Sequence, residues 1–429
     1  MKPDSGIANP PRFPLEHAGM FPVAAPTRRA FPHRARQLFS IAAAAGLALG
    51  LLGAAALRAA PPEMAEVEPG VAYANDRIRS KPWSIHIARV EREPSRFTVI
   101  TTHANGAAVG LTTLSEQIKS VSPKDGRPVA GVNGDFYLRD RSPYAGDPRG
   151  LQIVSGEVIS APNGGVCFWM DPAGEPHSAH VVSKFKVTWP DGRTTPVGLN
   201  EPLRGGGAVL YTPALGASTR YTNGLELVLA KVDGEPWLPL TIGREFSGRV
   251  RQVNPAGNSP LTPEVMVLSL GRQLSGLASA VKPGDVLKIS TASSPDLAGV
   301  QFAIGGGPRL VEKGRALKQK MPEDGHGALA YELRSIFERH PRSAIGWNKK
   351  YFYLIEVDGR QKNLSIGMTL DELGEYLAKL GCDEVMSLDG GGSAMFWVNG
   401  RIANKPCDGW ERAVANAVVV VRKEKEPAP

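Results

Sequence analysis

An acidic residue followed by three glycines, at the end of an apolar run, constrains this chain more than any other feature. The stretch reads Ser387-Leu-Asp-Gly-Gly-Gly-Ser393. Three glycines cost backbone entropy on folding, whereas a plain hairpin needs only one or two residues with positive φ. The glycines therefore indicate that the backbone next to Asp389 turns sharply or approaches another group closely.

Two further stretches of the chain resemble this one. Ala303-Ile-Gly-Gly-Gly-Pro-Arg309 has the same order of strand, triple glycine, strand and a later Gly-Arg turn, and Asn133-Gly134-Asp135 is a shorter elbow of the same kind. A single elbow is usually a bulge or a tight hairpin. Glycine runs also let backbone N–H groups form a concavity for an anion, and three elbows in one chain favour a shared ligand site.

The pattern along the chain predicts the fold class. With 48 glycines and 36 prolines, apolar runs such as 83–90 and 225–232 are short and separated by turn signals, which favours strands. Thr369 to Leu380 is the clearest helix, because Thr369 and Glu372 form a capping box and leucines follow at spacings of three and four. We expect an α+β fold over residues 81–424, with a mixed β-sheet core, flanking helices and glycine-rich strand-end loops.

The first 60 residues are typical of an export leader. A basic stretch at 28–36 precedes an apolar run at 38–57, followed by small residues and prolines. This order predicts a cytoplasmic basic stretch with either a cleaved signal peptide or a membrane anchor, and a twin-arginine route stays open at Arg28-Arg29. Residues 61–80 are expected to be a linker. The rest of the chain would be periplasmic or secreted, or held at the inner membrane through residues 38–57.

Charge and cysteine content exclude several partners. Residues 1–60 hold seven basic and two acidic residues, so most of the net charge of +8 belongs to the leader, and no nucleic-acid partner is expected. The three cysteines have no metal-ligand spacing, and we predict neither a metal nor a cofactor. Cys382 and Cys407 are expected to be free thiols, with a disulfide between them left open.

Common catalytic motifs are missing from the sequence. There is no P-loop, no Gly-x-Ser-x-Gly elbow before a helix, no His-Glu-x-x-His pair and no acid-rich calcium loop, and the Asp389 glycines precede a strand, unlike a dinucleotide fingerprint. Carboxylates, glycine amides and arginines remain. Arginine binds phosphate oxygens in a bidentate way, so Arg309, Arg342 and Arg412 are candidates.

Five motifs occur together and in order, and together they resemble one family. They are Asn133-Gly-Asp-Phe-Tyr137, Ile304-Gly-Gly-Gly-Pro-Arg-Leu310, Pro341-Arg-Ser-Ala-Ile-Gly346, Gly367-Met-Thr-Leu370 and Leu388-Asp-Gly-Gly-Gly-Ser393. Over roughly residues 80–422 the chain resembles the phosphodiester glycosidase family, whose bacterial members are often described as exopolysaccharide-biosynthesis-related. The resemblance implies an enzyme that hydrolyses the bond between an anomeric sugar carbon and a phosphodiester.

The resemblance also implies site residues. The catalytic candidates are Asp389, Arg342 and Asn133. The substrate-binding candidates are Asp135, Gly305, Gly306, Gly307, Arg309, Gly391, Gly392, Ser393 and Arg412. Asp135 and Ser343 depart from the family pattern, which commonly has a small residue and often a threonine at these places.

The expected partner is a sugar phosphodiester or a phosphorylated glycan of the cell envelope. Glycine amides and Arg342 would stabilise the charge on the leaving phosphate, and Asp389 would act as base, nucleophile or hydroxyl-orienting group. The alternative is a non-catalytic carbohydrate- or envelope-binding protein that uses the same cradle.

Overall fold

The computed structural model describes residues 62–104, 109–139, 143–222, 224–320 and 335–424. All of them belong to one compact unit, Ala59–Pro429, and the predicted leader, residues 1–60, lies outside the described residues. Within the described ranges, none of the helices combines the length and apolarity needed to cross a bilayer.

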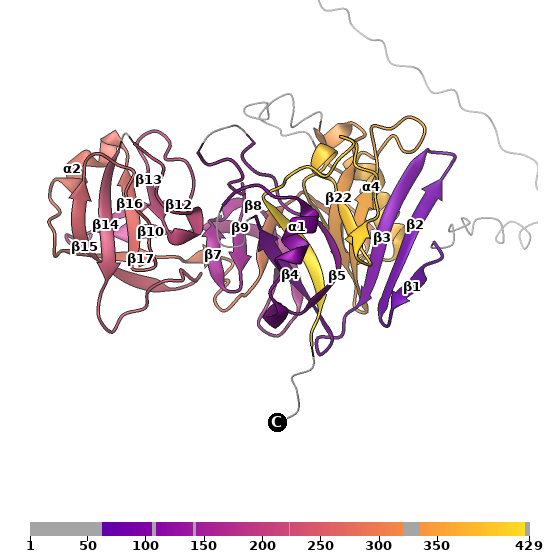
Figure 1. Ribbon diagram of the computed structural model, residues 1–429, viewed down its shortest axis with the longest axis horizontal. Helices are drawn as coiled ribbons and strands as arrows, with labels where there is room; N and C mark the ends of the chain where they lie inside the picture. The colour runs from indigo at the N-terminus through magenta and orange to yellow at the C-terminus, as the bar shows by residue number, and fades with distance from the viewer. Residues whose placement is uncertain (1–61, 105–108, 140–142, 223, 321–334, 425–429) are drawn as a thin grey trace, which may run out of the picture. The chain divides into compact units, whose positions relative to one another are not determined.

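Two of the sheets combine strands from the N-terminal and the C-terminal parts of the described chain (Figure 1). The first has the order β1 (Ala65–Glu68), β2 (Val71–Ile78), β3 (Trp83–Glu91), β23 (Tyr351–Val357), β22 (Arg342–Trp347), β24 (Glu384–Ser387), β20 (Arg309–Glu312) and β21 (Arg315–Ala316). The second has the order β26 (Arg401–Ile402), β25 (Phe396–Val398), β5 (Arg127–Asn133), β27 (Asn416–Arg422) and β4 (Phe97–His103).

Two further sheets hold the middle of the chain. A six-stranded sheet has the order β18 (Ser293–Ser294), β9 (Pro176–Ser183), β8 (Asn163–Met170), β19 (Ala303–Gly306), β6 (Gln152–Val154) and β7 (Glu157–Ser160). An eight-stranded sheet has the order β11 (Thr194–Pro196), β10 (Lys186–Thr188), β17 (Val286–Ser290), β15 (Glu245–Asn254), β14 (Leu225–Lys231), β16 (Val265–Leu270), β13 (Ala208–Tyr211) and β12 (Gly198–Leu199). Of the pairings between these strands, only β12 with β13 is parallel.

The six-stranded sheet belongs to two hydrophobic cores at once. Successive side chains of a strand point to opposite faces, and in β8 Phe168 and Met170 enter the core shared with β5, β22, β23 and β27. Cys167 and Trp169 enter the other core, which the middle eight-stranded sheet fills with residues such as Leu227 and Leu268. The six-stranded sheet therefore packs on the middle eight-stranded sheet with one face and on the remaining sheets with the other.

The helices whose bounds fall within the described ranges are few and short. They are α1 (Leu114–Lys119), α2 (Ser275–Ala278) and α4 (Leu370–Leu380), with 3-10 turns η1 (Pro123–Asp125), η2 (Pro213–Leu215), η3 (Arg272–Leu274) and η4 (Gly391–Ser393). The α4 prediction is confirmed, with its Thr369–Glu372 capping box and with Gly381 in the left-handed conformation that ends it. Its leucines cover Ile85, Leu310 and Ala344 on one face of the first sheet.

The predicted fold class is wrong. The described chain is mostly β, built from antiparallel sheets, and it has no layer of flanking helices. Helix α4 covers one face of the first sheet and the short helix α1 packs on the second sheet, while the opposite face of the first sheet is buried by other sheets. The prediction of flanking helices rested on one strongly amphipathic helix, α4. The rest of the chain consists mainly of short strands and turns, which form further sheets.

The expected linker at 61–80 is also not seen. Residues 65–68 and 71–78 form β1 and β2, and β2 pairs along its whole length with β3. Val71 is buried in the core beside Val90, so the segment gains apolar burial that a linker would lack.

The α4 cap gives a stability prediction. In Thr369→Ala the Glu372 amide loses the hydroxyl that accepts its hydrogen bond at 3.1 Å, so the free energy of unfolding should fall by about 1 kcal/mol. Urea unfolding measures this. Thr194→Ala, at an exposed position of edge strand β11, should change it by less than about 0.5 kcal/mol, and an equal loss in both variants would contradict the role of the cap.

Candidate functional site

Three strand ends meet at Asp389, which lies two residues after the end of β24. The Asn133 amide, at the end of β5, donates a hydrogen bond to the Asp389 carbonyl (2.7 Å) and accepts one from the Ser343 hydroxyl of β22 (2.6 Å). The Asp389 N–H donates to the Gly134 carbonyl (2.9 Å). Asn133 is fully buried and its side chain is used in these bonds, so it positions Asp389 and does not face a substrate.

The amides of the glycine elbows bond to the protein itself. Gly390 N–H donates to the Asp389 carboxylate (2.8 Å), and Gly391 N–H donates to the Pro341 carbonyl (2.9 Å). In the upstream elbow, Gly305 N–H donates to the Leu151 carbonyl (2.6 Å), and Gly307 N–H donates to the Ser387 carbonyl (2.8 Å). These four amides are therefore engaged within the chain, contrary to the anion concavity expected from the sequence.

Close approach explains the glycines better. A Cβ on Gly305 would stand 2.5 Å from Asp135 Oδ2, and one on Gly306 would stand 2.8 Å from the Ser387 carbonyl oxygen. A Cβ on Gly392 would overlap the Arg412 guanidinium. Side chains at these positions would push apart the strands and the arginine that surround Asp389.

Two of the predicted arginines do not reach Asp389. The Arg342 guanidinium is buried and donates to the carbonyls of Met368 (2.8 Å), Ser335 (2.6 Å) and Glu338 (2.7 Å). Since neighbouring side chains of a strand point to opposite faces, Arg342 lies on the other face of β22 from Ser343.

Arg309 is also held away from Asp389. Its guanidinium forms ion pairs with Glu384 (3.0 Å) and Glu312 (2.8 Å) on the first sheet. Arg342 and Arg309 therefore bind carbonyls and carboxylates of the protein, so the structure gives neither of them the phosphate-binding position expected from the sequence.

Other arginines surround the acid. Arg412 lies against Gly392, is held by Asp408 (2.9 and 2.5 Å), and acts electrostatically on Asp389. Exposed Arg139 acts on the same carboxylate. The exposed guanidinium of Arg360 lies 3.0 Å from the place where a Gly391 Cβ would stand.

Arg139 and Arg360 were missed in the sequence, although signals for both were present. Arg139 follows the Asn133–Tyr137 motif by two residues, and Arg360 ends the Asp-Gly-Arg turn directly after β23. With Arg412 they place three guanidinium groups around the Asp389 loop, which is a suitable setting for a phosphodiester.

Asp389 and Asp135 have perturbed acidities. Burial raises the pKa of Asp389, while Ser393, the Gly390 amide and Arg412 each lower it. Burial also raises the pKa of Asp135 to about 7, although the amides of Gly150 and Phe136 donate to its two oxygens. The Asp135 carboxyl is therefore held by backbone amides beneath the site, where it packs against Gly305 and Gly150.

A hydroxyl and aromatic rings complete the surroundings. Ser393 Oγ is buried beside Asp389 and Tyr137, and hydrogen bonding to it lowers the pKa of both groups, although none of the described residues meets it in full hydrogen-bond geometry. Phe136 and Trp410, the neighbours of Asp135 and of the Asp408–Arg412 segment, expose 36% and 69% of their surface. The site thus offers a buried hydroxyl and exposed aromatic faces, which suit a sugar.

The three cysteines are free thiols. Cys167 and Cys382 are buried and Cys407 is partly buried. Cys382 and Cys407 therefore do not form the disulfide that the sequence left open.

Comparison with known proteins agrees with the family resemblance. Residues 245–421 match the family model for phosphodiester glycosidases. Over 68 residues the chain is 40% identical to a bovine N-acetylglucosamine-1-phosphodiester alpha-N-acetylglucosaminidase, a match that covers 16% of this chain and 12% of the bovine protein. The chain thus spans only about an eighth of the length of its curated relatives, 13% and 12%.

Solved structures support the fold. A hypothetical protein from Synechocystis superposes with a TM-score of 0.65 at 20% identity, covering 84% of this chain and 64% of that one. A protein from Burkholderia pseudomallei, named for its expected export, has a TM-score of 0.61 at 21% identity and covers 79% of this chain and 74% of that one. The match of residues 245–421 to the family model confirms the resemblance to the phosphodiester glycosidase family over that part of the chain.

A buried carboxyl near the site gives a pH prediction. Burial raises the pKa of Asp147 to about 8, and its Oδ1 lacks a hydrogen-bond partner within the described ranges. The folded state therefore holds a proton that the unfolded chain releases near pH 4, so stability should fall as pH rises from about 4 to about 8.

Asp147→Asn should flatten this dependence, because asparagine does not titrate. Each unit of raised pKa corresponds to about 1.4 kcal/mol, so the difference between pH 5 and pH 8 should shrink by at least that amount. Urea unfolding at both pH values measures it. Exposed Asp233→Asn is the control, and an unchanged slope in Asp147→Asn would rule out its buried proton.

Proposed function

We propose that this chain, whose residues 245–421 match the phosphodiester glycosidase family, hydrolyses the bond between an anomeric sugar carbon and a phosphodiester. The observation that carries the proposal is one half-buried carboxylate, Asp389, with Arg139, Arg360 and Arg412 around its loop.

The arginines suit the leaving group. As the bond between the anomeric carbon and the phosphate oxygen breaks, negative charge grows on the phosphate. Guanidinium groups fixed by the protein stabilise such charge without reorganising, and Arg412 is fixed by Asp408 and by its contact with Gly392. Arg412 takes the role that was expected for Arg342.

Asp389 suits the sugar. The anomeric carbon becomes positively charged as the phosphate leaves, and a carboxylate beside it stabilises that charge. Asp389 then either attacks this carbon or takes a proton from the water that does so. The products are a free sugar and a phosphate monoester, and the water supplies the sugar hydroxyl and the proton that balances the reaction.

The exposed rings and the Ser393 hydroxyl suit recognition of the glycan. Sugar rings pack their C–H faces on aromatic side chains, and Phe136 and Trp410 offer such faces on the segments that carry Asp135 and Arg412. We assign the substrate to the phosphorylated glycans of the envelope or extracellular material. Residues 1–60 would act as the export leader, and the name of the Burkholderia protein is compatible with export.

Asp389→Asn is the first test. The amide keeps an oxygen for the Gly390 N–H, so the fold should remain, while the turnover number should fall by about 10²- to 10⁴-fold. Release of free sugar from a panel of sugar-1-phosphodiesters measures activity, and calorimetry measures binding. Wild-type binding without product from any member would support the binding-protein alternative, and full activity of the variant would remove Asp389 from the mechanism.

Arg412→Gln with Arg309→Gln as its matched control tests the phosphate cradle. Loss of one preorganised donor should lower the turnover number by about 10²- to 10³-fold in Arg412→Gln. Arg309→Gln should stay within a few-fold of wild type, because its ion pairs with Glu312 and Glu384 lie elsewhere on the sheet. Equal losses in two variants of unchanged melting temperature would contradict the assignment.

A further inference from the structure

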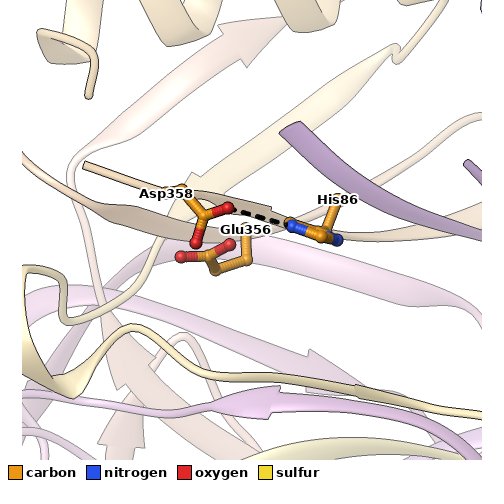
Figure 2. A group of neighbouring side chains, drawn as sticks. All are labelled: His86, Glu356 and Asp358. Carbon is orange, nitrogen blue, oxygen red and sulfur yellow. Dashed lines mark hydrogen bonds and ion pairs between the residues drawn. The ribbon is translucent and has the colours of Figure 1, made fainter. Parts of the chain in front are cut away.

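A second cluster of buried polar side chains lies behind the candidate site. His86 on β3, Glu356 on β23 and Asp358 just after β23 bring one ligand-type atom each within 4.8 Å of one another. His86 and Glu356 are direct partners in the strand register. Figure 2 shows the Glu356 carboxylate beside that of Asp358, with Asp358 joined to His86.

The Glu356 carboxylate is the unusual member. Only 1% of Glu356 is exposed, and neither of its oxygens meets a partner in full hydrogen-bond geometry in the described part of the chain, although the Asn404 side chain is close enough to act on it. An ionised carboxylate buried without a partner costs several kcal/mol, so such a group needs either a proton or a cation. Its oxygens lie next to Asp358 and His86, which are 1% and 2% exposed.

The spacing of the ligand-type atoms is compatible with a metal site. His86 Nε2 and Asp358 Oδ2 form a hydrogen bond of 3.1 Å, which is close to the separation of about 3.4 Å between two ligands bound at about 2.0–2.2 Å to one tetrahedral ion. The other ring nitrogen of His86 lies 2.8 Å from the Tyr73 hydroxyl. A hydrogen bond at that nitrogen is what usually orients a metal-binding histidine.

Asp358 is oriented in a similar way. Its Oδ1 accepts a hydrogen bond from the Lys405 N–H (2.8 Å), and its Oδ2 accepts one from the Ser84 hydroxyl (2.9 Å). These bonds fix the carboxylate toward His86 and Glu356. Two of the three ligand-type side chains, His86 and Asp358, are therefore oriented by other groups, as the ligands of a metal centre usually are.

We propose that His86, Glu356 and Asp358 bind one structural Zn²⁺ ion. Two carboxylates and a neutral imidazole balance the ion's two positive charges, and an imidazole in the donor set favours zinc over calcium or magnesium. This inference does not depend on the proposed glycosidase activity, because metal content and stability can be measured without a substrate.

The ion would stabilise the framework of the candidate site. Glu356 lies opposite Ser343 in the β22–β23 register, and Ser343 is bonded to Asn133. Through Lys405, Asp358 holds the segment that leads to Arg412. Zinc at this cluster therefore joins β3, β23 and the Arg412 segment, and its role is structural because the cluster is buried beneath the strand ends.

Metal analysis of the purified full chain tests the proposal. After saturation with ZnSO₄ and removal of loosely bound ions, the wild type should retain about one zinc per chain, and Zn²⁺ should raise its melting temperature. Glu356→Gln keeps the shape of the side chain and removes a ligand charge, so both effects should be lost. His86→Gln should behave the same way, which covers the case that one variant folds poorly.

His177→Ala is the matched control for surface binding. It removes the histidine of the exposed His177–Asp171 pair and should retain the zinc and the thermal shift of the wild type. Circular dichroism checks that each variant is folded. Absence of zinc from the wild type with no thermal shift, or equal zinc in wild type and Glu356→Gln, would overturn the proposal. Retention of Ca²⁺ or Mn²⁺ in place of Zn²⁺ would overturn the choice of ion.

Discussion

The buried side chain of Asn133 is the interaction on which the candidate site depends. One amide joins three separate segments, because it donates to the Asp389 carbonyl and accepts from the Ser343 hydroxyl and the Met395 N–H. A buried amide with satisfied bonds stabilises the fold, whereas each partner left unpaired would cost about 1–3 kcal/mol. The position of Asp389 is therefore set by hydrogen bonds made far from its carboxylate.

The glycine elbows act together with this amide. They allow strands, a carboxylate and an arginine to approach closely, since side chains at Gly305, Gly306 and Gly392 would collide with the groups around Asp389. The sequence showed where the backbone needs glycine and which acidic residue lies next to it. It did not distinguish amides that point at a ligand from amides that bond within the protein, because both demand glycine.

Local patterns predicted local structure well. The α4 helix and the strands expected at 83–90 and 225–232 are present as α4, β3 and β14, and the two triple-glycine elbows run from strand through turn to strand. Each of these depends on propensity and neighbours in the chain. The prediction of the wider architecture was wrong. Strands such as β3 and β23 pair across about 270 residues, and no local sequence pattern encodes the number of sheets.

Side-chain direction was the second limit on prediction. Arg342 was predicted to reach the phosphate, yet it lies on the opposite face of β22, and Arg139 and Arg360 were overlooked. The cluster of His86, Glu356 and Asp358 was equally invisible, since its members meet only through strand register. Pairing over long distances, and not composition, decides which charged groups meet.

The central claim is that Asp389 and the arginines around its loop hold a sugar-linked phosphate. A crystal structure of Asp389→Asn with an intact sugar-1-phosphodiester tests it most directly. The phosphate oxygens should bind the Arg412 guanidinium, and the anomeric carbon should face residue 389. A phosphate bound at Arg342, at Arg309 or in the middle eight-stranded sheet would show that Asp389 and the arginines around its loop do not form the substrate site.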